Sequence, residues 1–162
     1  MRIRADEHVA QAIVAAIRDI ALSPGWELDS VRSAGQQGSS DVHWITSFMQ
    51  DGGHAILSAD RDFLENPPQV DAVFRTGARV IHLPPKWGQA KGRLQAAHIL
   101  MWWDRIEKCV ASMRERECYR PPWNVNETGQ LQKVTIDFQA AQKKVKKAAR
   151  KPLLADARSG RN

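Results

Sequence analysis

Residues 54–63 read His-Ala-Ile-Leu-Ser-Ala-Asp-Arg-Asp-Phe, and this stretch decides the fold that the sequence predicts. Its first six residues form the most apolar run of the chain, which predicts a strand from His54 to Ala59 that is buried on both faces. Strands of this kind are typical of parallel sheets covered by helices. Asp60 and Asp62 follow the strand directly, at the position where open α/β folds place their functional sites.

Strand-like and helix-like patterns alternate along the first half of the chain. Strands are expected at residues 2–5, 26–31, 54–59 and 78–83. Amphipathic helices are expected at residues 8–22, from a cap at Ser39 or Ser40 to residue 51, and from Pro67 to residue 76. This alternation predicts a three-layer α/β/α sandwich around a parallel sheet of four to five strands, with right-handed crossovers.

The second half of the chain is expected to add a long helix and a basic tail to this sandwich. The helix is predicted over residues 89–117, and the Arg-Pro-Pro-Trp sequence of residues 120–123 breaks it. Residues 131–138 fit either a strand or an ordered arm. We therefore expect a domain over residues 1–123, an arm over residues 124–142, and a basic, disordered tail over residues 143–162.

The net charge of +6 is concentrated at the C-terminal end of the chain. Residues 143–162 hold 8 of the 24 Lys and Arg residues and 1 of the 18 Asp and Glu residues. The first 142 residues therefore carry 16 basic and 17 acidic residues, a net charge of −1. A near-neutral body argues against a broad nucleic-acid-binding surface on the folded part. The tail is then either an electrostatic contact for RNA phosphates or a solvated run of charge.

The sequence also indicates the compartment in which the protein works. No apolar run approaches the roughly 18–20 residues that span a bilayer, so no membrane partner is expected. The first six residues are too polar for a secretory signal. Cys109 and Cys118 form neither a disulfide framework nor a zinc pair by their spacing. We therefore expect a cytoplasmic protein with two reduced thiols.

Four acidic residues occupy the positions where strands end or helices begin. Asp6 ends the first strand, Asp41 opens the second helix, and Asp60 and Asp62 follow the third strand. Such positions converge on one edge of a parallel sheet, where the carboxylates repel one another unless a hard cation, usually Mg²⁺ or Mn²⁺, lies between them. Ions held in this way activate water for phosphodiester hydrolysis. The simpler alternative for Asp6 and Asp41 is that they are acids at helix N-termini, where the helix dipole favours negative charge.

The same residues resemble a known family. Asp6-Glu7 after the first strand, an acid at the head of the second helix, and the Ser-x-Asp-x-Asp-Phe sequence of residues 58–63 resemble the PIN-like domain nucleases. The resemblance covers residues 1–85 and is closest to the short PIN-like branch. Toxins of the VapC type belong to the same superfamily.

This resemblance implies a ribonuclease that uses Mg²⁺ or Mn²⁺ to cut RNA. Asp6, Asp41 and Asp60 would be the first three acidic ligands, and Asp62 would be a fourth that acts through water. Ser58 resembles the family's small hydroxyl residue, which orients a neighbouring carboxylate or a metal-bound water. A toxin of this kind would also need an antitoxin that inserts a helix or a basic side chain into the acidic site.

Other contacts are expected from charge and aromatic content. Arg61 lies between two acids and either grips phosphate or offsets their charge. Exposed aromatic residues of the long helix would suit a homodimer. Trp87 and Trp123 stand beside prolines and are expected to hold loops, with stacking on bases as the alternative. Contacts to RNA phosphates are expected from four tail residues, Lys143, Lys144, Lys146 and Lys147.

Two other functions stay open at this point. A PIN-like module that has lost catalysis would bind RNA or protein, although all four acidic positions still carry carboxylates. A phosphoacceptor receiver domain also places acids after its first and third strands. A receiver needs a catalytic lysine after a fifth strand, however, whereas Lys86 follows the fourth strand predicted here.

Overall fold

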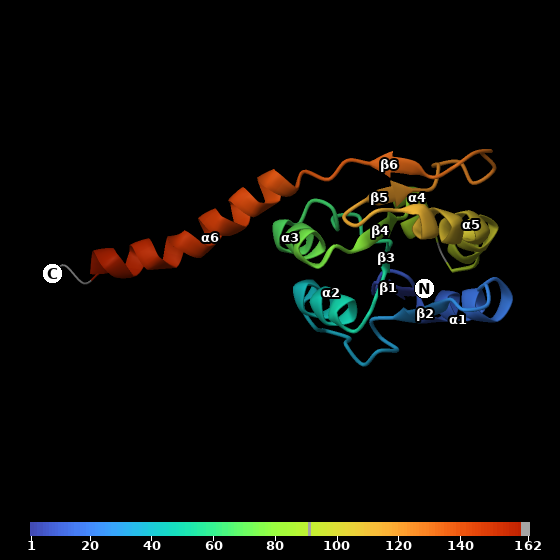
Figure 1. Ribbon diagram of the computed structural model, residues 1–162, viewed down its shortest axis with the longest axis horizontal. Helices are drawn as coiled ribbons and strands as arrows, with labels where there is room; N and C mark the ends of the chain where they lie inside the picture. Colours follow the sequence, from blue (N-terminus) through green and yellow to red (C-terminus); the bar gives the residue numbers. More distant parts are fainter. Residues whose placement is uncertain (91, 160–162) are drawn as a thin grey trace.

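A six-stranded sheet forms the middle layer of the computed structural model, which describes residues 1–90 and 92–159 (Figure 1). Its strands are β1 (Arg2–Ala5), β2 (Glu27–Ser30), β3 (Ala55–Ser58), β4 (Arg79–His82), β5 (Cys118–Arg120) and β6 (Gln132–Val134). The helices are α1 (Gln11–Ile20), α2 (Asp41–Gln50), α3 (Pro67–Thr76), α4 (Pro85–Gly88), α5 (Arg93–Ser112) and α6 (Phe138–Ser159).

The strand order β2-β1-β3-β4-β5-β6 determines which loops lie close together. Strands β1 to β5 run parallel, and β6 pairs antiparallel with β5. The predicted α/β sandwich with a parallel sheet is confirmed. The strand count differs, because the three-residue strand β5 was not predicted and β6 lies within residues 131–138, which fitted either a strand or an ordered arm. All five parallel strands end at one edge of the sheet, which we call the carboxyl edge.

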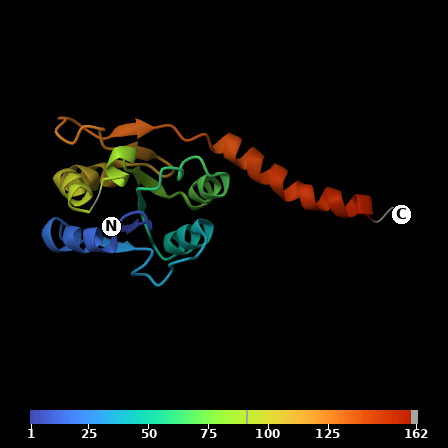
Figure 2. The ribbon, with the colours of Figure 1, turned by 180° about the vertical axis from the view of Figure 1, so that it is seen from behind.

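Helices cover both faces of the sheet, α1 and α5 on one face and α2 and α3 on the other (Figures 1 and 2). Successive side chains of a strand point to opposite faces. Accordingly, Leu57 packs in the cluster with α1 and α5, whereas its neighbour Ile56 packs in the cluster with α2 and α3. All four residues of β3 are buried, as the apolar run of residues 54–59 predicted.

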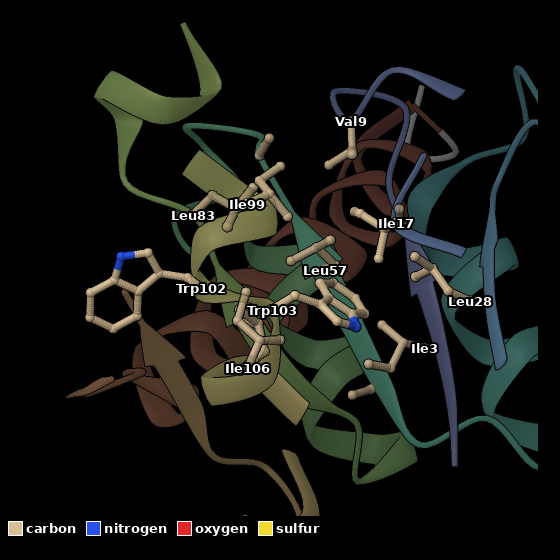
Figure 3. Packing of buried hydrophobic residues seen from close by; sticks show 14 of the residues in the cluster. Ile3, Val9, Ile17, Leu28, Leu57, Leu83, Ile99, Trp102, Trp103 and Ile106 are labelled. Atoms are coloured by element: carbon tan, nitrogen blue, oxygen red, sulfur yellow. The ribbon is translucent and has the colours of Figure 1, made fainter. Parts of the chain in front are cut away.

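Two adjacent tryptophans of α5 are among the largest side chains buried on their face of the sheet. Trp102 and Trp103 are both fully buried. Figure 3 shows Trp103 pointing toward Leu57 and Ile3, whereas Trp102 points to the other side of the helix. The indole N–H of Trp103 donates to Glu107 at 2.7 Å, so its polar atom is satisfied. Both tryptophans are therefore part of the core and are not among the exposed aromatic residues that a dimer interface would need.

The helix predicted over residues 89–117 is shorter at both ends in the structure. The short helix α4 precedes this range, and α5 runs from Arg93 to Ser112, before β5. Gly92 stands at the N-cap of α5 with a φ of 42°, a conformation that L side chains rarely adopt. The strand β5 was missed because it is three residues long and is followed directly by two prolines.

Helix α6 occupies most of the tail that was predicted to be disordered. Alanine, glutamine, lysine and arginine, which dominate it, are good helix formers. The Asp137 carboxylate accepts a 2.8 Å hydrogen bond from the Ala140 amide at the start of the helix. Phe138 packs on Phe74 of α3 with ring centroids 5.3 Å apart, and the helix then projects away from the sandwich (Figures 1 and 2). The sequence suggested a solvated helix end and a disordered tail from residue 143, and in the structure α6 continues to Ser159; residues 160–162 lie outside the described residues.

Two smaller expectations can be compared with the structure. Cys109 and Cys118 are free thiols. Within the part of the chain that the structure describes, no helix has the length and apolar character needed to cross a membrane.

Candidate functional site

Asp6 is the centre of the candidate site because the fold buries its carboxylate at the carboxyl edge. It follows β1 directly, and the residue is only 4% exposed. Its backbone N–H continues the sheet by donating to the Leu57 carbonyl of β3 at 3.0 Å. The side chain is therefore positioned by the pairing of the two central strands, β1 and β3.

Donors from the end of β3 surround this carboxylate. The Ser58 hydroxyl donates to Oδ2 at 2.5 Å, and the backbone N–H groups of Ala59 and Asp60 donate to it at 3.1 and 3.2 Å. The N–H of His8 donates to Oδ1 at 3.0 Å. The Ser-x-Asp sequence of residues 58–60 thus forms a cradle of hydrogen-bond donors for Asp6.

Two opposing effects act on the protonation of Asp6. Burial raises the pKa of this carboxyl above its ordinary value of 3.8, because water is excluded from the charged form. The hydrogen bonds from Ser58, Ala59 and Asp60, together with the nearby His8, lower the pKa but do not cancel the effect of burial. A positive charge placed beside Asp6 would stabilise its ionised form. A carboxylate that binds a cation is expected to respond in this way.

Asp60 lies next to Asp6 and is held through its backbone. Its carbonyl accepts a 2.8 Å hydrogen bond from Nε2 of His82, the last residue of β4. Nδ1 of the same ring is the partner of the Arg120 guanidinium, at the end of β5. Burial and then Arg120 lower the pKa of His82, while the Asp60 carbonyl raises it. A neutral His82 that donates from Nε2 and accepts at Nδ1 satisfies both contacts.

The structure shows that sequence reasoning missed the link between His82 and Arg120. His82 could have been found, because it ends a predicted strand at the same edge as Asp60. Arg120 could not have been found in this way, since β5 was not predicted.

Asp62 and Arg61 lie on the outer side of this region. Both residues are exposed. The Asp62 N–H donates to Oδ1 of Asp60 at 3.0 Å, a local turn that orients the Asp60 carboxylate and leaves Asp62 at the surface.

Asp41 has two hydrogen-bond partners of its own. The indole N–H of Trp44 donates to its Oδ1 at 2.9 Å, and the Gln69 amide of α3 donates to Oδ2. The cap of α2 is Ser40, whose hydroxyl accepts the N–H of His43. In this structure Asp41 thus connects α2 to α3, a role for which the sequence held no signal beyond its place in the first turn of a helix.

A cavity of about 330 Å³ opens beside Asp6. Its lining includes Asp6, Glu7 and Ser30 together with Arg32 and Gln37 from the loop after β2. This loop is anchored, since the Gly38 N–H donates to Glu7 at 3.0 Å and Arg32 donates to Gln37 at 2.9 Å. The cavity therefore places a guanidinium near the buried carboxylate, an arrangement suited to a phosphate beside a cation.

A larger cavity of about 500 Å³ lies elsewhere, between α2, α3 and α6. It is lined mainly by the aliphatic parts of these helices, and its one carboxylate, Asp71, is paired with Arg75 at 2.8 Å. None of the predicted site residues lines it, so it is not a candidate for the acidic site. The four tail lysines, Lys143, Lys144, Lys146 and Lys147, are exposed on α6.

Whether these residues suit a metal ion depends on how many ligating side chains lie together and on which donor atoms they carry. Among residues 1–90 and 92–159, no three His, Cys, Asp or Glu side chains lie close enough together to hold one. The residues brought together, Asp6 and Asp60, offer oxygen donors, which Mg²⁺ and Mn²⁺ prefer. Mg²⁺ commonly keeps several waters and binds through only one or two carboxylates together with substrate phosphate. The donor chemistry therefore fits such an ion, with Asp6 and Asp60 as the residues that would hold it.

Fold and site together define an α/β domain with an acidic centre at the carboxyl edge. A family model described as a PIN-like domain matches residues 1–85, more than half of the chain, and the chain belongs to this family. The match covers β1 to β4 and includes Asp6, Asp41, Ser58, Asp60 and Asp62. The family assignment gives the domain a nuclease-type fold. Searches of curated proteins and of solved structures found no significant match.

Proposed function

We propose that the protein is a metal-dependent endoribonuclease that hydrolyses RNA phosphodiester bonds. The observation that supports this most strongly is the buried Asp6 carboxylate, held by Ser58 and by the Asp60 N–H at the carboxyl edge of a PIN-like domain. A carboxylate that is removed from water and held in one orientation suits the binding of a cation better than contact with solvent.

Asp6 and Asp60 would hold Mg²⁺ or Mn²⁺, with Asp41 and Asp62 as further candidate ligands. When bound, the ion would lower the pKa of a water and neutralise charge on the phosphate. The Ser58 hydroxyl fixes the orientation of Asp6, and His82 fixes the backbone of Asp60. Arg32 lines the adjacent cavity, where its guanidinium would bind a phosphate oxygen of the RNA.

The partners follow from the same proposal. The RNA backbone would contact the lysines of α6, the most basic part of the chain. If the protein is the toxin of a toxin–antitoxin pair, its antitoxin would present a basic side chain to Asp6 and Asp60 and exclude the cation. RNA cleavage and its inhibition by an antitoxin would take place in the cytoplasm. A homodimer would form through other side chains than Trp102 and Trp103, because these two are buried.

A second function is favoured by one observation. Asp6 already has four hydrogen-bond donors, and the described residues bring no third His, Cys, Asp or Glu side chain to the same point. A PIN-like module that binds RNA or protein without cutting would need no more than this structural use of the carboxylate.

Metal-dependent cleavage distinguishes the two functions. A pool of single-stranded and hairpin RNA is incubated with the full-length protein in Mg²⁺, in Mn²⁺ or in EDTA, and the products are resolved on a gel. The nuclease proposal predicts cutting in either metal and none in EDTA. RNA binding without cutting in any of the three conditions, and no heat on Mn²⁺ titration, would favour the binding module.

A further inference from the structure

A second concave feature lies at the carboxyl edge, beyond the acidic centre. It is a cavity of about 320 Å³ lined by Lys86, His98, Trp123, Asn124 and Val125. Trp123 is 63% exposed, although tryptophans are on average well buried and the other indoles near it, Trp87 and Trp102, are fully buried.

The exposed indole stands on a loop that is firmly held. The indole N–H of Trp87 donates to the Trp123 carbonyl at 3.2 Å, and the indole N–H of Trp102 donates to the Val125 carbonyl at 2.9 Å. Two buried tryptophans thus anchor the backbone on either side of Asn124. These hydrogen bonds use the backbone of the loop and not the Trp123 side chain, whose exposed ring is therefore available to a ligand.

Polar groups around the ring have the character of a nucleotide site. Nζ of Lys86 lies 3.8 Å from the centroid of the Trp123 ring. The ring of His98 packs on Trp87, and its buried Nδ1 has no hydrogen-bond partner among the described residues. A buried polar atom without a partner is unfavourable unless a ligand or water supplies the missing bond. The cavity therefore combines an aromatic face and a cation, and one of its lining residues, His98, carries an unsatisfied nitrogen.

The topology places this cavity and the acidic centre along one edge. Lys86 lies in α4, shortly after β4, and Trp123 follows β5, just as Asp60 follows β3. These strands are parallel neighbours, so their following loops lie side by side. Two strand spacings, about 10 Å, separate β3 from β5. A few nucleotides of an extended single strand would span that interval.

We propose that this cavity binds an unpaired base of single-stranded RNA close to the bond that is cut. The base stacks on Trp123, Lys86 contacts the phosphate attached to it, and His98 Nδ1 bonds to the edge of the base. This inference rests on the proposed function for the identity of its ligand, and it narrows the substrate to RNA whose bases are free to stack, since a duplex keeps its bases paired and stacked.

The test measures binding separately from cleavage. The probe is a fluorescein-labelled single-stranded oligoribonucleotide of about a dozen nucleotides, a length typical of the sites of proteins that bind single strands. It is titrated with the protein in EDTA, and binding is followed by fluorescence anisotropy. Trp123→Ala should weaken binding roughly 5- to 150-fold, the range of aromatic–base stacking, and Trp123→Phe should recover most of it. Ile20→Ala removes another exposed apolar side chain, 74% exposed, and should bind as the wild type does.

An abasic scan identifies the stacked base. Oligoribonucleotides that lack one base at each position in turn should show one position where wild-type binding weakens but binding by Trp123→Ala does not. Wild-type affinity in Trp123→Ala, or no binding of single-stranded RNA by the wild type, would overturn the inference. Stacking on Trp123 without cleavage in Mn²⁺ would leave it standing while removing the nuclease proposal. Self-association abolished in Trp123→Ala, with RNA affinity unchanged, would instead assign the ring to a protein interface.

Discussion

The hydroxyl of Ser58, the last residue of β3, donates a 2.5 Å hydrogen bond to the carboxylate of Asp6, the residue after β1. Both side chains are buried, and the bond crosses between two adjacent parallel strands. The register of the central strands thus sets the geometry of the candidate site. A shift in this pairing would separate Asp6 from the donors that form its cradle.

Removing this hydroxyl should lower both stability and activity. Ser58→Ala leaves the buried Asp6 carboxylate with fewer donors, and we expect the free energy of unfolding to fall by roughly 1–3 kcal/mol. Cleavage should fall by about 10- to 100-fold, as for residues that orient metal ligands. Urea unfolding and cleavage assays measure the two effects. Ser112→Ala, at an exposed serine, is the control. Unchanged values for Ser58→Ala would show that the cradle does not orient Asp6.

The raised pKa of Asp6 predicts a particular pH dependence of stability. In the unfolded chain this carboxyl titrates near its ordinary value of 3.8, and in the folded protein it titrates higher because of burial. Between these two pKa values the folded state binds more protons, so the contribution of Asp6 to stability decreases as the pH rises through this window. In Asp6→Asn this part of the pH dependence should vanish. Urea unfolding from about pH 4 to pH 7 in EDTA measures it, and identical slopes for both proteins would contradict the effect.

Asp41 and Asp62 were both predicted to be ligands, yet their surroundings differ. Asp41 accepts hydrogen bonds from Trp44 and Gln69, whereas Asp62 is exposed. In metal-free buffer, Asp41→Ala should lower the free energy of unfolding by roughly 1–3 kcal/mol, because two donors lose their acceptor. Asp62→Ala should change it by less than about 0.5 kcal/mol. Equal stability of the two variants would mean that the link between α2 and α3 contributes nothing.

The four lysines of α6 should affect the affinity for RNA and not the rate of cleavage. Replacing Lys143, Lys144, Lys146 and Lys147 together by glutamine keeps good helix formers and removes four charges. Binding should weaken, and the slope of log K against log salt should flatten by about 0.7 for each RNA phosphate that these lysines no longer neutralise. Cleavage at saturating RNA should stay unchanged. Lys108→Gln, which removes a lysine paired with Asp104, serves as the control. An unaltered salt slope would assign α6 to another partner.

Much of this architecture could be predicted because strong patterns specify it. The apolar run at residues 54–59 predicted a buried central strand, and β3 is fully buried. The Pro67 start and the Gly77 end of α3 were also predicted, and Gly77 adopts the left-handed conformation that ends helices. The three-residue strand β5 was missed, since so few residues show no period, and β6 lies within residues 131–138, which fitted either a strand or an ordered arm.

Only part of the candidate site could be predicted from the sequence. Position after a strand correctly places Asp6 beside Asp60, but nothing in the sequence shows that Asp41 would meet Trp44 and Gln69 instead. Side-chain partners at the same edge depend on which loops become neighbours in three dimensions. The contact of His82 with the Asp60 carbonyl is another such case.

The central claim is that Asp6 and Asp60 hold a divalent cation that is needed to cut RNA. The most direct measurement compares the cleavage rate of the wild type, Asp60→Asn and Asp19→Asn over a Mn²⁺ titration, with EDTA as the blank. Asp19 is exposed on α1 and serves as a charge-matched control. We predict Mn²⁺-dependent cleavage by the wild type and by Asp19→Asn, and a loss of about 100-fold or more in Asp60→Asn. Equal cleavage by all three proteins, or cleavage that persists in EDTA, would contradict the claim.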